Sequence, residues 1–430
     1  MSKAEKLSTK PYKGVRDFYP EDMAIERYIF DTWSKTAEAF GYARYDASIL
    51  EPAELYKSKG AENEEIVNEQ TYTFTDRGKR EVTLRPEMTP TVARMIAGRQ
   101  RELAAPIRWY SIPNLFRYER AQRGRLREHW QLNCDIFGVE DISADIEIIS
   151  LAYQLLTDFG ASPDMFEIRI NSREFMDEWY TTLGITEAST KKQITKLNDR
   201  KNKISDAEYL EQLRKILPEP FAIEELKKEI ENTDVTHIKP ETPLRKIIES
   251  LQALGITNVI LDKTIARGFD YYTGTIFEVF DTNPDNNRAM LGGGRYNNLT
   301  GLFSEERTPG IGFGMGDVTM LDFLTTHQLL PEDITNTGPT VAIVPTDTIY
   351  HLVGQQLAQS IRVAGFSTAV DISERKRDKK ISRVRKDGTK YLIVVGEDEV
   401  QNQTYSLQDL QNNTNISGTL QELLTHLTSK

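Results

Sequence analysis

The sequence predicts an α+β region over residues 1–330 and a smaller α/β domain over residues 340–430. In the first region, short alternating or apolar runs typical of strands outnumber helical patterns and show no regular strand–helix alternation. In the second region, strand-like runs alternate with helices at short spacing, which favours a small parallel or mixed sheet. A chain of 430 residues is long enough for two or three domains, each with its own core.

The first element that the sequence predicts is an amphipathic helix over residues 21–41. Its apolar side chains recur at steps of three or four residues, and Gly41 suits a C-terminal cap. This stripe consists of Ile25, Ile29, Trp33, Ala37 and Phe40. A possible strand over 42–50 follows and stops at Glu51-Pro52.

A group of strands, interrupted by two helices, accounts for the chain up to residue 170. The strands are predicted at 81–85, 107–112, 114–121, 131–138 and 165–170, and the helices at 89–103 and 143–160. The stretch of about 173–250 is rich in lysine and glutamate with weak apolar stripes, so it predicts a small helical insertion.

Strands resume after the insertion. They are predicted at 258–262 and 274–280, and a glycine-rich run at 310–316 leads into a helix. A linker at 331–339 precedes the C-terminal domain, whose strand-like runs are VAIVP, FSTAVDI and YLIVVG.

Composition limits the class of protein. Hydrophobic residues make up 39% of the chain and charged residues 28%, as in soluble globular proteins. No apolar run approaches the ~18 residues that a membrane span needs, and the N-terminus lacks the apolar part of a secretory signal. The single cysteine, Cys134, cannot form an internal disulfide, so we expect a cytoplasmic protein.

Charge is unevenly distributed. The net charge of −11 argues against non-specific coating of nucleic acid. Nevertheless, residues 375–390 (RKRDKKISRVRKDGTK) concentrate lysine and arginine. Both a solvated helix face and an RNA contact remain open for this run.

Two of the predicted strands bring polar side chains together. If 114–121 and 131–138 pair as an antiparallel hairpin, one face is apolar and the other polar. The polar face carries Arg117, Glu119, Gln131 and Asp135, and the connecting loop carries Arg120, Arg123, Arg125 and Arg127. The mixed face suits a small zwitterion and the arginines suit a polyphosphate, although a solvated sheet face would also be polar.

Other motifs allow two interpretations each. Glu87, just past a strand end, is either a turn carboxylate or a ligand for an ammonium group. The glycines at 292–294 indicate either a tight turn or a backbone that a flat ligand approaches closely. Those at 310–316 do not fit a dinucleotide-binding motif, but they could line a nucleotide site at a helix N-terminus.

Several kinds of active site are excluded. The five histidines are scattered without a metal-binding motif, so we expect no metal site in the protein itself. No P-loop and no Gly-x-Ser-x-Gly elbow occur. Cys134 falls on the apolar strand face and is predicted to be a packed thiol.

Taken together, these motifs resemble the histidine–tRNA ligase family of class II aminoacyl-tRNA synthetases. The resemblance covers nearly the whole chain. It rests on KGVRDFYPED near the N-terminus, LFRYER with LNCDIFG, ARGFDYYTGTIFE, GGGRY, and VVGEDEVQNQTYSLQDL near the end. It implies a catalytic domain on an antiparallel sheet with helices and a C-terminal anticodon-binding α/β domain.

The resemblance also implies the reaction and its site. L-Histidine would be activated by ATP to histidyl-adenylate and transferred to the 3′ end of tRNA(His). ATP with Mg²⁺ would be the substrate complex, with no tightly bound cofactor, and the enzyme would be a homodimer. The catalytic residues would be Arg117 and Arg267. Histidine would be held by Glu87, Met88, Thr89, Arg117, Gln131, Asp135, Arg267, Tyr271 and Tyr272, and ATP by Arg117, Glu119 and Arg125.

The sequence departs from the family pattern at its third motif, which usually ends in Gly-Leu-Glu-Arg. Here the run is Gly316 to Thr319, so Thr319 stands where the family has an ATP-contacting arginine. Another cation would then have to serve, and the loop around Arg307 is one candidate. Asn297-Asn298 replaces the usual Asp-Gly.

Two other functions stay open. The histidine-sensing regulatory subunit of ATP phosphoribosyltransferase lacks ligase activity and usually lacks the C-terminal domain. Arg117, Arg267 and residues 340–430 favour the ligase, whereas Thr319 favours the regulatory subunit. A structural or nucleic-acid-binding protein is the third interpretation, disfavoured by the acidic charge.

Overall fold

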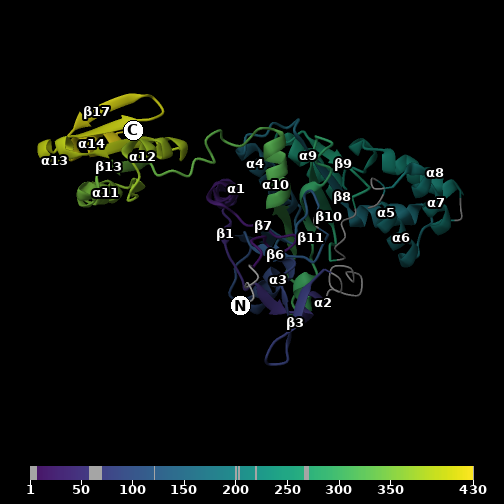
Figure 1. Cartoon of the computed structure of the whole chain (residues 1–430). Helices are drawn as coiled ribbons and strands as arrows, with labels where there is room; N and C mark the ends of the chain where they lie inside the picture. The colour runs from purple at the N-terminus through teal and green to yellow at the C-terminus, as the bar shows by residue number, and fades with distance from the viewer. Residues whose placement is uncertain are drawn as a thin grey trace. The chain divides into compact units, whose positions relative to one another are not determined.

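The structure is a computed structural model of the chain. It describes residues 7–57, 70–120, 122–198, 201, 204–217, 220–265 and 271–429. The chain forms two compact units, which are coloured by residue number in Figure 1. The larger unit comprises Met1–Asp17 with Ile29–Leu329, and the smaller comprises Phe18–Tyr28 with Leu330–Lys430.

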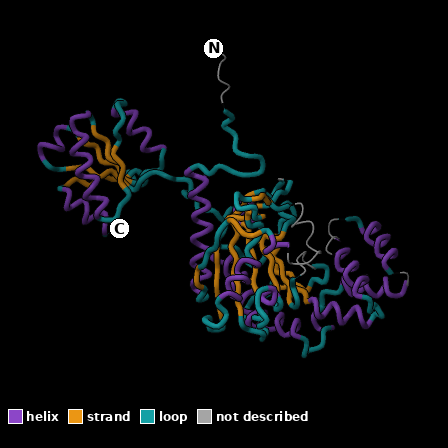
Figure 2. Tube along the Cα trace, turned by 90° about the horizontal axis from the view of Figure 1, so that it is seen from below, coloured by secondary structure: helices purple, strands orange, loops and turns teal. Residues whose placement is uncertain are grey.

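The larger unit is built on a mostly antiparallel, nine-stranded sheet, seen as the orange strands at the centre of Figure 2. Its central strands run antiparallel to their neighbours in the order β5 (Ile107–Ser111), β7 (Glu128–Phe137), β12 (Gly310–Gly316), β11 (Ala289–Arg295), β10 (Thr275–Asp281) and β8 (Phe166–Ser172). At the two edges, β1 (Ala43–Arg44) pairs in parallel with β5, and β9 (Val259–Leu261) pairs in parallel with β8. The short strand β6 (Asn114–Phe116) pairs antiparallel with the start of β7. The predicted antiparallel sheet is confirmed.

Helices cover this sheet because each has an apolar face. In α1 (Pro20–Ala39), whose residues from Ile29 onward belong to this unit, the predicted stripe buries Ile29, Trp33 and Ala37 completely. Gly41 adopts a φ of 81°, the left-handed conformation expected of a C-terminal cap. The other helices around the sheet are α3 (Thr89–Gly98), α4 (Ser143–Asp158), α9 (Pro243–Ala253) and α10 (Asp317–Thr326).

A second, three-stranded sheet lies near the start of α3. Its order is β2 (Leu50–Pro52), β4 (Glu81–Leu84) and β3 (Tyr72–Thr75), all antiparallel. Helix α2 (Glu54–Lys57) follows β2, and a 3-10 helix at Leu299–Leu302 follows β11.

Four helices after β8 form the predicted helical insertion, grouped beside β8 in Figure 1. They are α5 (Arg173–Thr182), α6 (Ala188–Asn198), α7 (Asp206–Ile216) and α8 (Pro220–Glu231). They share a core of their own, which includes Ile194, Leu213 and Leu226. The next helix, α9, packs on α4 instead, so the separate core ends before residue 243.

The C-terminal unit holds a five-stranded mixed sheet. Its order is β14 (Thr368–Val370), β13 (Val341–Pro345), β15 (Tyr391–Val395), β16 (Tyr405–Asp409) and β17 (Thr414–Gly418). The first three strands are parallel and the last two antiparallel. Its helices are α11 (His351–Val363), α12 (Arg377–Lys386), α13 (Glu397–Asn402) and α14 (Leu420–Thr428). Of the two sheet types predicted for this domain, the mixed one forms.

Some predicted strands are wrong in extent. The strand expected at 42–50 is reduced to β1 and the start of β2. The strand expected at 114–121 ends at Phe116, because the backbone N–H of Glu119 turns back to the carbonyl of Arg117 at 2.8 Å. In the described parts of the chain, none of the helices has the length and apolar character needed to cross a membrane.

Candidate functional site

A cavity of about 950 Å³ opens on the main sheet of the larger unit. Its floor includes Gly292, Gly312 and Gly314 of strands β11 and β12. Its walls come from the start of α3, the β6–β7 hairpin, the chain after residue 270, and the start of α10. The site therefore collects segments that are far apart in the sequence.

At several glycines of β11 and β12, neighbouring main-chain and side-chain atoms occupy the space that a Cβ atom would take. A Cβ atom on Gly312 would lie 2.6 Å from the carbonyl oxygen of Cys134 and 2.7 Å from the hydroxyl of Tyr296. A Cβ atom on Gly294 would lie 2.6 Å from the carbonyl oxygen of Thr275. The tight-turn interpretation of the glycines at 292–294 is wrong, since they lie inside strand β11. At Gly294 and Gly312, the close approach of neighbouring groups is what requires a glycine.

Three tyrosine rings pack together at one end of the cavity. The rings of Tyr271 and Tyr272 lie 4.8 Å apart, and that of Tyr296 lies 5.9 Å from Tyr271 at nearly a right angle. All three line the cavity, and the hydroxyl of Tyr271 donates to Oε2 of Glu87 at 3.3 Å. This end offers aromatic surface and a carboxylate to a small, partly polar ring.

Asp135 lies behind this aromatic cluster. It is 3% exposed and is not among the described residues that line the cavity. The hydroxyl of Tyr296 donates to its Oδ1, while Oδ2 has no hydrogen-bond partner among the described residues. Burial raises the pKa of Asp135 to about 7, against the lowering effect of the Tyr296 hydrogen bond. Asp135 is thus connected to the cavity through the Tyr296 hydroxyl, and its predicted role in binding histidine stays a prediction.

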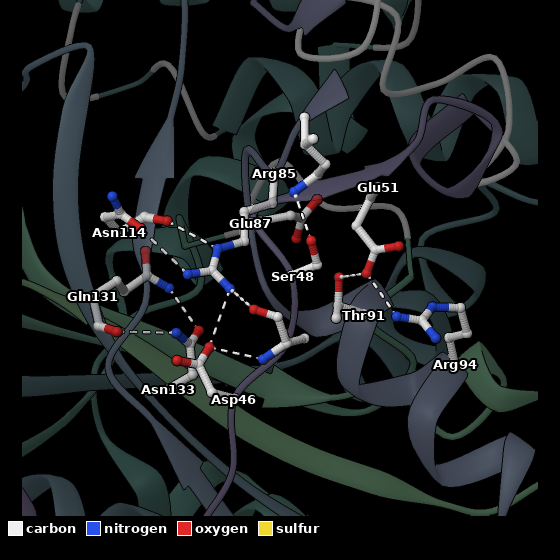
Figure 3. A network of polar contacts seen from close by, with 12 residues as sticks. Asp46, Ser48, Glu51, Arg85, Glu87, Thr91, Arg94, Asn114, Gln131 and Asn133 are labelled. Atoms are coloured by element: carbon white, nitrogen blue, oxygen red, sulfur yellow. Dashed lines mark hydrogen bonds and ion pairs between the residues drawn. The ribbon is translucent and has the colours of Figure 1, made fainter. Parts of the chain in front are cut away.

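Glu87 is fixed by the turn between β4 and α3. The Glu87 side chain is 5% exposed. Arg85, two residues earlier, is 3% exposed and holds this turn in place. As Figure 3 shows, Arg85 bridges to Asn114 and to Asp46: its Nε donates to the Asn114 carbonyl at 3.0 Å and its Nη1 to Asp46 Oδ1 at 3.2 Å. No pattern in the sequence pointed to this role for Arg85, which depends on two distant segments.

Met88 and Thr89 begin helix α3. Met88 is the N-cap residue with its side chain fully buried, so only its backbone is available to a ligand. Thr89 lines the cavity. The first N–H groups of a helix lack intrahelical partners, which makes this turn suited to a carboxylate or carbonyl oxygen.

The β6–β7 hairpin carries most of the charge. Arg117, Glu119 and Arg125 line the cavity as a group, and Nε of Arg125 lies 2.7 Å from Oε2 of Glu119. Nε of Arg117 donates to the carbonyl of Pro86 at 2.8 Å, which ties this guanidinium to the turn before Glu87. The Arg117 guanidinium is thus anchored at the turn that precedes Glu87, the residue expected to hold an ammonium group.

Gln131 joins the same wall from strand β7. Its Nε2 donates to Oδ1 of Asn133 at 2.8 Å, and Nδ2 of Asn133 donates back to the Gln131 carbonyl at 3.1 Å (Figure 3). Asn133 is 4% exposed. This pair orients the Gln131 amide toward the cavity.

Some expected residues fall elsewhere. Arg267 lies outside the described residues, so its approach to the Arg117 guanidinium remains a prediction. Arg307 is exposed, donates to Oδ1 of Asn298 at 3.0 Å, and is not among the described residues lining the cavity. Thr319 does line the cavity. Cys134 is fully buried, as expected of a packed thiol.

Sequence reasoning missed His129, Tyr296 and Arg288, which all line the cavity. Burial, followed by the guanidiniums of Arg117 and Arg16, lowers the pKa of His129 to about 3, so its imidazole is neutral at physiological pH. The GGGRY motif did contain Tyr296, but a pattern cannot tell which of its side chains faces a cavity.

The arrangement suits one kind of chemistry. One end offers carboxylate, amide and tyrosine groups for an amino acid with a polar ring, and the adjoining wall offers guanidiniums for phosphate oxygens. Among the described residues, no cluster of histidine, cysteine, aspartate or glutamate could hold a metal ion. Binding two reactants side by side is what a phosphoryl or nucleotidyl transfer requires.

Comparison with known proteins gives consistent matches. The histidyl-tRNA synthetase family model matches residues 14–318, and an anticodon binding domain model matches residues 340–430. A histidine–tRNA ligase of Leptospira biflexa is 42% identical, covering 98% of both chains. One of Thermoplasma volcanium is 37% identical, covering 96% of this chain and 97% of the other.

Solved structures share the fold. A histidyl-tRNA synthetase from Nostoc sp. PCC 7120 superposes with a TM-score of 0.82 at 22% identity, covering 99% of this chain and 100% of the other. A Bacillus halodurans protein described as an ATP phosphoribosyltransferase regulatory subunit/histidyl-tRNA synthetase gives 0.74 at 21% identity, covering 91% and 99%.

Proposed function

The chain belongs to the histidyl-tRNA synthetase family, and from this we propose that it activates L-histidine with ATP and transfers the histidyl group to tRNA(His). The observation that carries the proposal is one cavity in which a tyrosine–carboxylate pocket adjoins an arginine-rich hairpin. ATP enters as its Mg²⁺ complex, so the metal ion belongs to the substrate.

The first step joins histidine to AMP. Glu87 and Gln131 hold the α-ammonium group, and the rings of Tyr271 and Tyr272 enclose the imidazole. A carboxylate oxygen of histidine attacks the α-phosphorus, the bond from that phosphorus to the bridging oxygen breaks, and pyrophosphate leaves. Arg117 and Arg267 stabilise the charge that grows on the non-bridging oxygens. No protein nucleophile is needed, because the bound reactants already lie in reach of each other.

The second step transfers the histidyl group. A hydroxyl of the terminal ribose of tRNA(His) attacks the carbonyl carbon of the adenylate, AMP leaves, and the hydroxyl proton is released. Residues 340–430 contribute by binding the anticodon end of the tRNA. Selectivity for histidine comes from polar groups of the site that hydrogen-bond to the ring nitrogens. A site built for these hydrogen bonds disfavours analogues that lack the nitrogen atoms.

The remaining assignments are proposals of the same kind. Met88 and Thr89 contact histidine through the first turn of α3, Asp135 acts through Tyr296, and Glu119 and Arg125 contact ATP. A homodimer in the cytoplasm fits the family pattern, with α1 and the segment at Glu51-Pro52 near the dimer interface.

The regulatory-subunit alternative is favoured by one observation, the threonine at position 319. Against it, the matched histidine–tRNA ligases extend over nearly the whole chain, and residues 340–430 match an anticodon binding domain.

The proposed function is tested by ATP–pyrophosphate exchange with each of the twenty amino acids. We expect exchange with L-histidine alone, because only its ring satisfies the polar groups around the tyrosines. Charging of tRNA(His), with a non-cognate tRNA as the control, tests the second step. Histidine binding without any exchange would support the regulatory subunit and contradict the ligase.

A further inference from the structure

Position 319 leaves the cavity without a cation from helix α10. Thr319 lines the cavity, and its hydroxyl lies 3.2 Å from the carbonyl oxygens of both Met290 and Gly316. The hydroxyl is therefore engaged by backbone acceptors of the protein itself. A phosphate near this wall would need a donor from another element.

Arg288 brings a guanidinium to the same place. It is the last residue of the connection between β10 and β11, and it lines the cavity. A Cβ atom on Gly124, whose φ is +69°, would lie 2.8 Å from Cδ of Arg288 and 3.4 Å from Cγ2 of Thr319. The Arg288 stem thus passes beside a glycine and near a threonine. A long side chain at 319 would compete for this space.

The hairpin and the β10–β11 connection are tied together beside Arg288. Nη2 of Arg123 donates to Oδ1 of Asn286 at 2.8 Å, and Nδ2 of Asn286 donates to Oδ2 of Asp281 at 2.6 Å. Asp281 is the last residue of β10. These bonds join the hairpin to the connection that carries Arg288.

The Arg288 guanidinium is in an electrostatic environment that favours an added anion. No hydrogen bond or ion pair joins it to another described residue of the chain. Burial and repulsion from Arg125 lower the pKa of Arg288, and attraction to Glu119 opposes this only in part. A bound polyanion would relieve the repulsion between the two guanidiniums.

We propose that Arg288 binds the outer phosphates of ATP, in place of the cation that position 319 lacks. The inference rests on the proposed function and identifies a residue of its nucleotide site. Arg288 would also stabilise pyrophosphate as it leaves, because a guanidinium donates two parallel hydrogen bonds to phosphate oxygens.

The test uses the full chain in histidine-dependent ATP–pyrophosphate exchange. Arg288→Gln keeps most of the stem beside Gly124 and removes the charge. We expect the KM for ATP to rise roughly 10- to 100-fold, as loss of a charge-assisted hydrogen bond implies. The KM for pyrophosphate rises as well, while the KM for histidine is unchanged. Arg288→Lys keeps a positive charge, so it should raise the KM for ATP less than Arg288→Gln does.

Arg307→Gln is the matched control, since Arg307 is exposed and outside the described lining of the cavity. It should leave the KM for ATP unchanged. An unchanged KM for ATP or pyrophosphate in Arg288→Gln, or a rise as large in Arg307→Gln, would overturn the inference.

A double variant tests whether the two positions serve the same phosphates. In Thr319→Arg with Arg288→Gln, a new guanidinium extends from α10 into the vacated space. We expect the KM for ATP to fall back toward that of the unaltered chain. A double variant that melts normally but shows no recovery would contradict the shared role. Absence of exchange in the unaltered chain would refute the proposed function instead, so the two failures are distinguishable.

Discussion

Asp135 is a carboxyl group whose protonation is coupled to folding. Its pKa of about 7 in the folded chain lies far above the ~3.9 of an exposed aspartate. Between these values the folded state keeps a proton that the unfolded state has lost. The free energy of unfolding therefore falls as pH rises, by up to ~1.4 kcal/mol per pH unit, until Asp135 ionises near neutrality.

We predict that Asp135→Asn removes this pH dependence. The amide keeps an acceptor for the Tyr296 hydroxyl but cannot titrate. Chemical denaturation from pH 5 to pH 8 should show the variant gaining stability over the unaltered chain as pH rises. Asp141→Asn is the control, because the exposed Asp141 has a lowered pKa from its bonds with Ser143 and titrates below this range. Parallel pH curves for Asp135→Asn and the unaltered chain would rule out the coupling.

Which side chains of one strand face the cavity was predictable only in part. Alternation along β7 separated Gln131, which lines the cavity, from the buried Cys134. It also grouped Asp135 with Gln131, but Asp135 is buried and is not among the described residues that line the cavity. Arg288 and Tyr296 were not predictable in the same way. Their places depend on how β10, β11 and the hairpin meet, which no local pattern reveals.

Helix α12 shows two faces within ten residues. Lys380 is 3% exposed and donates from Nζ to the Pro345 carbonyl at 3.2 Å, so this cation is structural. The other cations of the helix are all exposed: Arg377, Lys379, Arg383, Arg385 and Lys386. The sequence left a solvated face and an RNA contact open for this run, and exposure is compatible with both.

We predict that replacing the five exposed cations of α12 with glutamine weakens tRNA charging. In a plot of the logarithm of tRNA affinity against the logarithm of salt concentration, the slope is negative. Its magnitude should decrease by roughly one for each phosphate that α12 no longer binds. Histidine-dependent exchange should not change, since no residue of α12 is among those lining the cavity. The control is Lys380→Gln, which should lower the melting temperature. Identical salt slopes before and after the replacement would show that α12 does not contact RNA.

Elements with a repeated apolar pattern were predicted well, as α1 and β7 illustrate. Strand β6 was predicted too long because residues 114–121 alternate as a strand does. The chain leaves the sheet after Phe116, where Arg117 bonds to the turn before Glu87 through the Pro86 carbonyl. This polar contact accompanies the turn at Glu119 that ends the strand, and hydrophobic alternation carries no information about either.

The C-terminal unit has its own core. Buried side chains from Val341 to Leu427 form one cluster, and a smaller cluster lies around Val344 and Leu392. None of the described residues lining the cavity comes from 340–430. The chemistry of activation and the recognition of tRNA are therefore expected to be separable.

We predict that removing residues 340–430 spares histidine-dependent exchange and abolishes charging of tRNA(His). The shortened chain keeps the cavity but loses the domain proposed to bind the anticodon end. Exchange and charging rates measured on the same preparation give the comparison, with the full chain as reference. Charging at the full rate by the shortened chain would contradict this division of roles.

The glycines of β11 and β12 have a consequence for anyone who wishes to redesign the enzyme for a non-natural amino acid. Even a methyl group at Gly294 or Gly312 would collide with main-chain oxygen atoms, which cannot rotate away. Mutant libraries randomised there would consist mostly of misfolded protein. Diversity should instead be introduced at side chains that line the cavity, such as Tyr271 and Gln131, because these can be replaced without adding atoms to the sheet backbone.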